Sequence, residues 1–190
     1  MWVAQSFRLS KGQRMLISGG MGSMGFSLPA AIGAAMASPK SRVLIVSGDG
    51  GIQINIQDMD TIVKHNLNIK IFVLNNGCLG MVRQFQDLYF DGRRQSTVIG
   101  YSCPDLIGIA EAYGMRSFLI SKTSEVAEKI KKTINSIGPA FVNVALEQGT
   151  MVNPKLVVGR PIEDMSPHMS REELKNIMIV KPVNQRQDHK

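Results

Sequence analysis

The sequence predicts an α/β fold, in which a mostly parallel sheet lies between two layers of helices in a three-layer α/β/α architecture. Short apolar runs rich in β-branched residues alternate along the chain with segments of helical periodicity. Two of these runs, RVLIVS at 42–47 and IKIFVLN at 69–75, are almost continuously apolar, which is typical of strands buried on both faces. The repeated order of strand and helix favours parallel strands joined by helical crossovers.

The first half of the predicted domain contains three strands and two helices. The strands are expected over residues 14–18 (RMLIS), 42–47 and 69–75, and the helices over residues 28–37 and 55–65. The first helix is rich in small residues and tolerates Pro29 in its first turn, where a helix leaves its amide donors unpaired. The second helix carries apolar residues at helical spacing, namely Ile56, Met59, Ile62 and Val63.

The second half continues the alternation with three helices and two strands. The helices are expected over residues 79–90, 105–113 and 125–137, and the strands over residues 116–120 and 140–146. The apolar side of the first of these helices consists of Met81, Val82, Phe85 and Leu88. The last helix places Val126, Ile130, Ile134 and Ile137 on one face. Gly138-Pro139, a pair that stops helices, follows it directly.

The regular alternation stops after Gly149, so we expect one domain over residues 1–149 and a C-terminal tail over residues 150–190. A short helix is expected within the tail over residues 171–177, because Ser170 and Glu173 form a capping-box pattern at its start. The polar stretch over residues 182–190 is expected to be disordered.

Composition narrows the class of protein. No apolar stretch is long enough to span a membrane, and the N-terminus lacks a signal-peptide pattern, so we expect a cytoplasmic location. The net charge of +7 comes from basic residues spread along the chain without a nucleic-acid-binding motif, which favours a solvated basic surface over a nucleic-acid partner. Two cysteines and three scattered histidines indicate neither a disulfide framework nor a zinc site.

Polar residues and glycines follow two of the predicted strands at their carboxyl ends, where ligands bind in open parallel sheets. SGDGG at 47–51 follows one strand and NNG at 75–77 follows the next. Consecutive glycines let the backbone approach a phosphate, but Asp49 would repel that phosphate unless a cation lay between them. Mg²⁺ bridges carboxylates to phosphates, and Asn76 offers a further oxygen. Each motif alone could be a simple turn, but together they indicate a magnesium–diphosphate site.

A GDG turn followed by a double asparagine after the next strand resembles the thiamine diphosphate (ThDP) motif of the pyruvate-decarboxylase-like superfamily. Residues 18–35, residues 48–86 and the opening MWVAQ are similar to the C-terminal ThDP-binding (pyrophosphate) domain of acetolactate synthase (acetohydroxyacid synthase) catalytic, or large, subunits. The similarity runs from Met1 to about Leu146. It implies the thiamine-diphosphate-binding fold for this chain.

The resemblance also implies cofactor ligands. Side-chain oxygens of Asp49 and Asn76 and the main-chain carbonyl of Cys78 would bind Mg²⁺. Further residues would surround ThDP, and these are Gly22, Ser23, Met24, Gly48, Gly50, Gly51, Gly80 and Met81.

Three of the implied positions are apolar and concern the shape of the bound cofactor and the substrate. Met24 matches the residue that holds ThDP in its bent form, with Gly22 and Ser23 lining the pyrimidine pocket. Met81 and Phe85 would line the substrate pocket beside the reacting carbon. Judged by residue type alone, Met24, Met81 and Phe85 could instead be core residues.

The activity that the resemblance implies is a transferase reaction of branched-chain amino-acid biosynthesis. Pyruvate is decarboxylated and joined to a second 2-keto acid, which gives 2-acetolactate. The full-length subunit would form a homo-oligomer, would bind FAD in a central domain and could take a regulatory small subunit. An apolar pocket wall favours the loss of charge at decarboxylation.

Several parts of the family pattern have no match in this sequence. The glutamate that activates the pyrimidine ring belongs to a separate N-terminal domain, FAD binds a further domain, and a Gly-Gln-His-Gln segment normally precedes MWVAQ. We therefore expect a fragment with no catalytic residue of its own, which does not turn over pyruvate without another polypeptide.

Two departures from the pattern leave other functions open. Phe85 stands where biosynthetic acetolactate synthases usually have tryptophan, and GDGGIQI differs from the commoner form of the motif. Another ThDP-dependent 2-keto-acid decarboxylase or carboligase is therefore an alternative. A non-catalytic phosphate-binding module on the same fold is a second one, because a fold does not determine a function.

Overall fold

The computed structural model describes residues 1–183, which fall into two units. The larger unit consists of Val3–Thr150, and the smaller one combines Met1–Trp2 with the residues from Met151 onward. The assignment of residues 1–149 to cofactor binding and of the rest to a tail remains a proposal.

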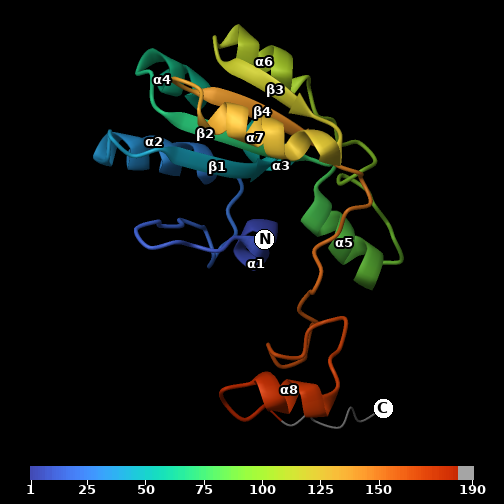
Figure 1. Cartoon of the computed structure of the whole chain (residues 1–190). Helices are drawn as coiled ribbons and strands as arrows, with labels where there is room; N and C mark the ends of the chain where they lie inside the picture. The colour runs from blue at the N-terminus through green and yellow to red at the C-terminus, as the bar shows by residue number, and fades with distance from the viewer. Residues whose placement is uncertain (184–190) are drawn as a thin grey trace. The chain divides into compact units, whose positions relative to one another are not determined.

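A four-stranded sheet forms the centre of the larger unit (Figure 1). Its strands are β1 (Val43–Gly48), β2 (Ile69–Asn75), β3 (Arg116–Ile120) and β4 (Ala140–Ala145). They lie in the order β1-β2-β4-β3, and every neighbouring pair is parallel. The predicted parallel sheet is thus confirmed, with four of the five predicted strands.

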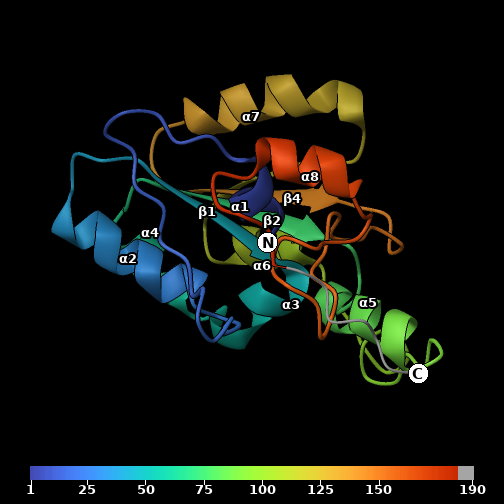
Figure 2. The same cartoon turned by 90° about the horizontal axis from the view of Figure 1, so that it is seen from below.

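Helices cover both faces of this sheet. On one face the major core contains residues of α2 (Ser27–Ala37), α3 (Asp49–Ile52), α4 (Asp58–Lys64) and α6 (Leu106–Ala112). On the other face α7 (Val126–Ile134) packs against a smaller core of Phe72, Ile120 and Val142. In Figure 2, α7 lies on one side of the strands and α2, α3 and α4 lie on the other. This arrangement confirms the three-layer prediction.

The remaining helices are short. They are α1 (Trp2–Ser6), α5 (Gly80–Tyr89), α8 (Arg171–Ile177) and two 3₁₀ turns, η1 (Gln53–Asn55) and η2 (Thr123–Glu125). In the smaller unit, α8 has the predicted bounds, and the Ser170 hydroxyl accepts a hydrogen bond from the Glu173 amide at 3.1 Å. Of the stretch predicted to be disordered, residues 184–190 lie outside the described residues.

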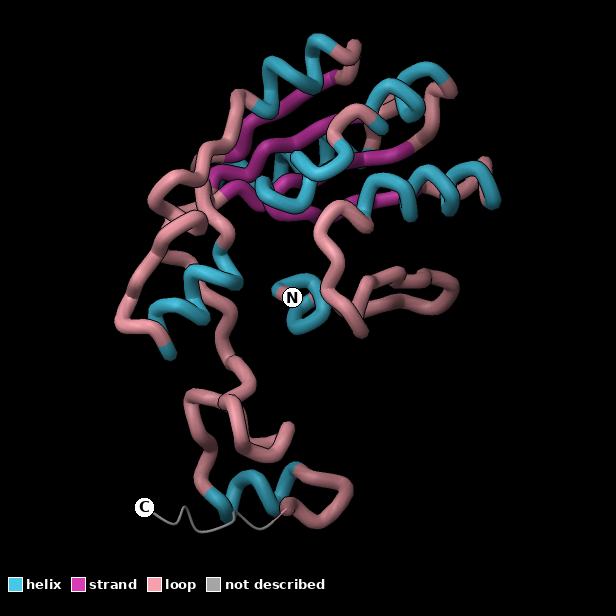
Figure 3. The backbone as a smooth tube through the Cα atoms, turned by 180° about the vertical axis from the view of Figure 1, so that it is seen from behind, coloured by secondary structure: helices cyan, strands magenta, loops and turns pink. Residues whose placement is uncertain are grey.

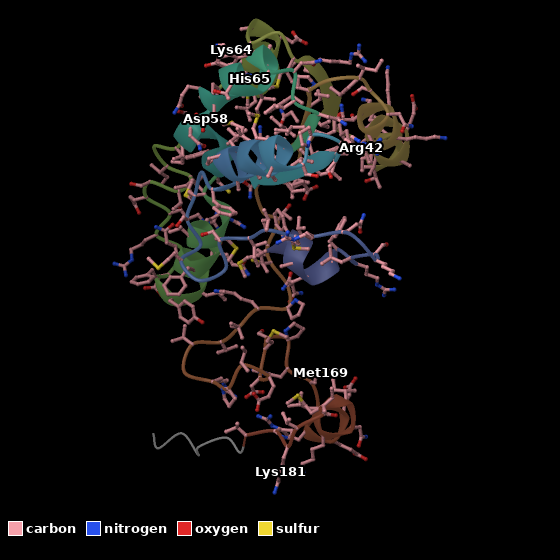
Figure 4. The ribbon with its side chains drawn as sticks, turned by 90° about the vertical axis from the view of Figure 1, so that its left-hand side faces the viewer. Arg42, Asp58, Lys64, His65, Met169 and Lys181 are labelled. Atoms are coloured by element: carbon pink, nitrogen blue, oxygen red, sulfur yellow. The ribbon has the colours of Figure 1, made fainter. Side chains whose placement is uncertain are left out.

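The helix predicted over residues 55–65 is divided in the structure. The chain turns helical directly after β1, at Asp49, and passes through η1 before α4 begins at Asp58. Asp58 lies in the first turn of α4 and Lys64 in its last turn (Figure 4), where their charges complement the helix dipole. The aspartate of the GDGG motif is therefore the first residue of a helical turn rather than part of a loop.

The strand predicted over residues 14–18 is wrong. Figure 3 draws the whole segment between α1 and α2 as loop, and the apolar side chains Leu16 and Ile17 are exposed. Among the described residues β1 pairs only with β2, so no neighbouring strand meets this segment. An apolar run without a partner leaves its backbone donors and acceptors unpaired and forms no ladder.

The strand predicted over residues 42–47 forms as β1, but the prediction that it is buried on both faces is wrong. β1 lies at the edge of the sheet, where Leu44 is 45% and Val46 is 40% exposed and only Ile45 is buried. Leu44 and Val46 stand beside Lys70 and Phe72 of β2, on the face that α7 covers over β3 and β4. In contrast, β2 lies inside the sheet, and its first five residues are buried.

Glu125 at the start of α7 provides a test of local electrostatics. Its carboxylate accepts hydrogen bonds from the Ser121 and Lys122 amides at 3.1 and 3.3 Å and pairs with Lys129 at 3.1 Å. The Ser121 bond, followed by Lys129, holds the pKa of Glu125 below its ordinary value of 4.5. Because the pKa of Glu125 is lower in the folded chain than in the unfolded chain, the ionised carboxylate stabilises the fold at pH values above the pKa of the unfolded chain. This stability is lost as the pH falls through the pKa of the folded chain. We expect the urea midpoints of wild type and Glu125→Gln to differ near pH 6 and to converge as the pH falls progressively below 4.5. A difference that does not shrink as the pH falls would contradict this.

No helix within residues 1–183 combines the length and apolar character that crossing a membrane requires.

Candidate diphosphate and cation site

The carboxyl ends of β1 and β2 bring the two sequence motifs together. Gly48, the last residue of β1, lies opposite Leu74 of β2, so Asp49 and Asn76 follow neighbouring strand ends. Both side chains are polar and buried, with exposed fractions of 2% for Asp49 and 7% for Asn76. Buried polar groups at such a position require partners.

Three oxygens converge at this point. In one orientation of the Asn76 amide, its oxygen lies 3.2 Å from Asp49 Oδ1 and 2.8 Å from the main-chain oxygen of Cys78, with no hydrogen between these oxygens. In the exchanged orientation the amide nitrogen occupies the same place and donates hydrogen bonds to both. The exchanged amide satisfies the site when no cation is present. The first orientation offers three oxygen ligands, a donor set that suits a hard divalent cation.

The Asp49 carboxyl group is buried and has polar partners. Burial raises the pKa of Asp49 above its ordinary value, while the Tyr101 hydrogen bond and the backbone amides of Asp49, Asn76 and Gly50 oppose that rise. A buried carboxylate is costly unless a positive charge or enough donors compensate it. A cation beside Oδ1 would supply that compensation.

At Cys78 the main-chain carbonyl, and not the thiol, faces the Asn76 amide. Its side chain is buried, and burial raises the pKa of the thiol, which favours the protonated form. Its Sγ lies 3.8 Å from the carbonyl oxygen of Gln148, so the thiol faces away into the loop after β4. Its main-chain oxygen is directed at Asn76.

Two residues at the site had no signal in the sequence. Tyr101 Oη donates a hydrogen bond to Asp49 Oδ2 at 2.8 Å. Gln53 Nε2 donates to Tyr101 Oη and to the Asp49 carbonyl oxygen, both at 3.1 Å. Burial and the adjacent Asp49 raise the pKa of Tyr101, which keeps its phenol protonated. A contact between residues 52 positions apart leaves no periodic pattern that sequence reasoning could detect.

The glycines of the motifs differ in what surrounds them. A Cβ on Gly50 would lie 2.5 Å from the Leu79 side chain and 3.2 Å from Met24 Cε, and one on Gly80 would lie 2.5 Å from Asn76 Nδ2. A Cβ on Gly51 would meet Ser47 Oγ at 3.0 Å, whereas one on Gly48 would meet nothing within 4 Å. Close packing therefore explains why Gly50 and Gly80 have no room for a side chain, whereas the space beside Gly48 at the end of β1 is empty of protein atoms.

The predicted Met24 position adjoins the GDGG turn. Its methyl group approaches Gly50, although the side chain remains 49% exposed. Gly22 and Ser23 lie on the same exposed loop, where their amides donate to the main-chain and side-chain oxygens of Ser18 at 2.7 and 3.1 Å. Their proposed roles around the cofactor stay predictions.

Met81 and Phe85 lie on α5, which begins at Gly80 beside Asn76. The predicted apolar side of this helix is exposed by 38–55%, whereas Arg83 and Gln84 are buried. Phe85 packs instead against Tyr89 and Phe90, with ring centroids 4.6 and 5.9 Å apart. The helix is confirmed, and the substrate-pocket role of Met81 and Phe85 remains a prediction.

Within residues 1–183 no group of three histidine, cysteine, aspartate or glutamate side chains is arranged to hold a metal ion. A shallow depression of about 240 Å³ lies at the opposite, amino-terminal ends of β1 and β2, lined by residues such as Ser41, His65 and Asn68. It shares no residue with the motifs.

Comparison with known proteins gives consistent matches. Residues 1–144 match the family model described as thiamine pyrophosphate enzyme, C-terminal TPP binding domain. The probable acetolactate synthase large subunit of Methanococcus aeolicus is 37% identical over 171 residues, which cover 88% of this chain and 28% of the relative. The acetolactate synthase isozyme 3 large subunit of Escherichia coli (strain K12) is 37% identical over 168 residues, which cover 87% of this chain and 29% of the relative.

A solved structure shares the fold. The thiamine diphosphate-dependent 4-hydroxybenzoylformate decarboxylase of Rhodococcus jostii RHA1 matches with a TM-score of 0.59 and 29% identity, over 66% of this chain and 24% of that one. The chain therefore spans between about a quarter and three tenths of the length of these relatives.

Proposed function

The chain belongs to the family of C-terminal TPP-binding domains of thiamine pyrophosphate enzymes, and from this premise we propose that it binds the diphosphate end of ThDP through a Mg²⁺ ion. The observation that carries the proposal is the convergence of Asp49 Oδ1, the Asn76 amide and the Cys78 carbonyl at two adjacent strand ends. Carboxylate, amide and carbonyl oxygens are ligands that Mg²⁺ accepts, with the remaining positions left for phosphate oxygens and water.

The residues around the cation have separate parts in this proposal. Asp49 supplies the negative charge that attracts the ion, and Asn76 and Cys78 supply neutral oxygens. Gly48, Gly50 and Gly51 leave the backbone free of side chains beside the diphosphate, with the open space at Gly48 giving the most direct support. Gly80 gives Asn76 room for its amide.

The thiazolium and pyrimidine rings of ThDP would lie near the loop and helix that adjoin the motif. Met24 approaches Gly50 and would support the bent cofactor, with Gly22 and Ser23 on the same loop. Met81 and Phe85 would provide an apolar wall for the substrate. ThDP itself supplies the electron sink for decarboxylation of a 2-keto acid, and the protein binds, orients and shields it from water.

The activity we propose is that of an acetolactate synthase catalytic subunit acting on pyruvate and a second 2-keto acid, supported by the two large subunits at 37% identity. A homo-oligomer of the whole subunit, a regulatory small subunit and a cytoplasmic location belong to the same proposal. The second candidate is a related 2-keto-acid decarboxylase, which the likeness to 4-hydroxybenzoylformate decarboxylase supports. Product analysis of a longer subunit, with pyruvate alone and with pyruvate plus 2-ketobutyrate, distinguishes these two candidates.

Calorimetric titration of ThDP into this chain tests the cofactor proposal directly. We expect binding in the presence of Mg²⁺, its loss in a chelator and its loss in Asp49→Ala. Asp60→Ala makes the same change at an exposed position of α4 and should bind like wild type. Binding that needs neither the metal nor Asp49 would refute the site as proposed.

A further inference from the structure

The hydrogen bond between Tyr101 and Asp49 divides the two carboxylate oxygens between different tasks. Tyr101 Oη donates to Oδ2 at 2.8 Å, while Oδ1 faces the Asn76 amide and the Cys78 carbonyl. Only Oδ1 is therefore directed at the place where the three oxygens converge. Asp49 is 2% exposed, so the surrounding packing restricts rotation of its carboxylate.

The direction of this hydrogen bond is determined by Gln53. Its Nε2 lies 3.1 Å from the Asp49 carbonyl oxygen, which can only accept, and this contact identifies the nitrogen end of the amide. The same nitrogen donates to Tyr101 Oη at 3.1 Å. The phenol oxygen thus accepts from Gln53, and its single proton is left for Asp49 Oδ2.

We propose that Tyr101, oriented by Gln53, is a positioning residue that keeps Asp49 a one-oxygen ligand and thereby makes the site select Mg²⁺ over Ca²⁺. This inference rests on the proposed function. Mg²⁺ requires near-octahedral coordination with one oxygen for each ligand, whereas Ca²⁺ accepts six to eight oxygens and often takes both oxygens of one carboxylate. A hydrogen bond that occupies Oδ2 penalises the two-oxygen arrangement, and it also holds the carboxylate in the orientation that directs Oδ1 at the cation in the one-oxygen arrangement. Partners of metal ligands commonly tune affinity in this way.

The test compares ion selectivity in wild type, Tyr101→Phe and a matched control. Each variant is mixed with ThDP and titrated with Mg²⁺ or with Ca²⁺ in a calorimeter. The concentration of each ion that gives half-maximal ThDP binding is measured. In Tyr101→Phe we expect Mg²⁺ to bind about 10-fold more weakly and Ca²⁺ to bind as well as before or better, so that the preference falls by about 10-fold. Tyr113→Phe removes a hydroxyl at the end of α6 and should keep the wild-type preference.

A second variant distinguishes a positioning role of Tyr101 from a loss of packing in Tyr101→Phe. Gln53→Met removes the donor that orients the phenol, and we expect the Mg²⁺ preference to fall in the same direction by a smaller factor. Equal weakening of both ions in Tyr101→Phe would mean that Tyr101 only supports the fold, and an unchanged preference would mean that it does not position Asp49. Either result overturns the inference about Tyr101. The proposed function still holds in both cases if the wild-type chain binds ThDP in a Mg²⁺-dependent way. Wild-type chain that binds ThDP without any divalent ion overturns both.

Discussion

Asp49→Asn is expected to abolish most Mg²⁺-dependent ThDP binding and, at the same time, to stabilise the cofactor-free fold by about 1 kcal/mol. Asp49 is almost completely buried, and its burial is the largest cause of the raised pKa of its carboxyl group. Without a cation, the folded chain carries the cost of a buried charge. Asparagine has nearly the same shape, carries no charge and can still accept the hydrogen bond from Tyr101.

Two measurements on the same variant separate binding from stability. Urea unfolding in a chelator reports the free energy of the cofactor-free fold, and calorimetry reports ThDP affinity with Mg²⁺, which we expect to weaken roughly 100-fold. Asp60→Asn, at an exposed position of α4, should change the unfolding free energy by less than about 0.5 kcal/mol and leave binding intact. A less stable Asp49→Asn chain in chelator would show that the donors around the carboxylate outweigh its desolvation.

Lys70→Ala is expected to reduce the free energy of unfolding by about 3–5 kcal/mol, the largest stability loss that we predict. Lys70 lies on the central strand β2 and is fully buried. Its ammonium donates hydrogen bonds to the carbonyl oxygens of Ser136, at 2.8 Å, and of Gly138. Alanine leaves a cavity in place of the side-chain stem and removes the donor from both carbonyls, which belong to the loop between α7 and β4.

Comparison with Lys70→Met separates the contribution of the stem from that of the charge. Methionine keeps most of the stem volume but donates no hydrogen bond, so we expect a smaller loss of about 1–3 kcal/mol. Lys64→Ala, at an exposed position near the end of α4, should cost less than about 0.5 kcal/mol (Figure 4). Urea unfolding of the three variants supplies the measurement. Equal midpoints for Lys70→Ala and Lys64→Ala would mean that the buried Lys70 side chain, stem and ammonium together, contributes no net stability.

Local pattern predicted the secondary structure well where each element depends on its own residues. The bounds of β2, β3 and α8 agree with the predicted ranges. The capping pattern at Ser170 predicted α8 because the hydrogen bond that begins the helix joins residues three positions apart. The strand expected over residues 14–18 failed because a strand also needs a neighbour, and an apolar run contains no information about that neighbour.

The residues of the candidate site also fall into those that local sequence predicts and those that it does not. The glycine-rich turn after β1 and the paired asparagines after β2 follow strands, and parallel strands end at a common edge, so Asp49 and Asn76 could be placed together from their order in the chain. The periodicity correctly placed Met81 and Phe85 on a helix. Their exposure could not be predicted, because it depends on which other segments pack against α5. Tyr101 and Gln53 could not be predicted, because nothing in the local sequence connects either residue to Asp49.

The sequence by itself determined the α/β class, the parallel direction of the strands and the two motifs at the carboxyl edge of the sheet, because periodicity and turn chemistry act over a few neighbouring residues. Only the tertiary structure decided that β1 is an edge strand, that the Cys78 carbonyl faces Asn76, and that Tyr101 restrains one oxygen of Asp49. The physical reason is that burial and hydrogen-bond geometry depend on segments far apart in the chain, and these meet only when the sheet and its helices have packed together.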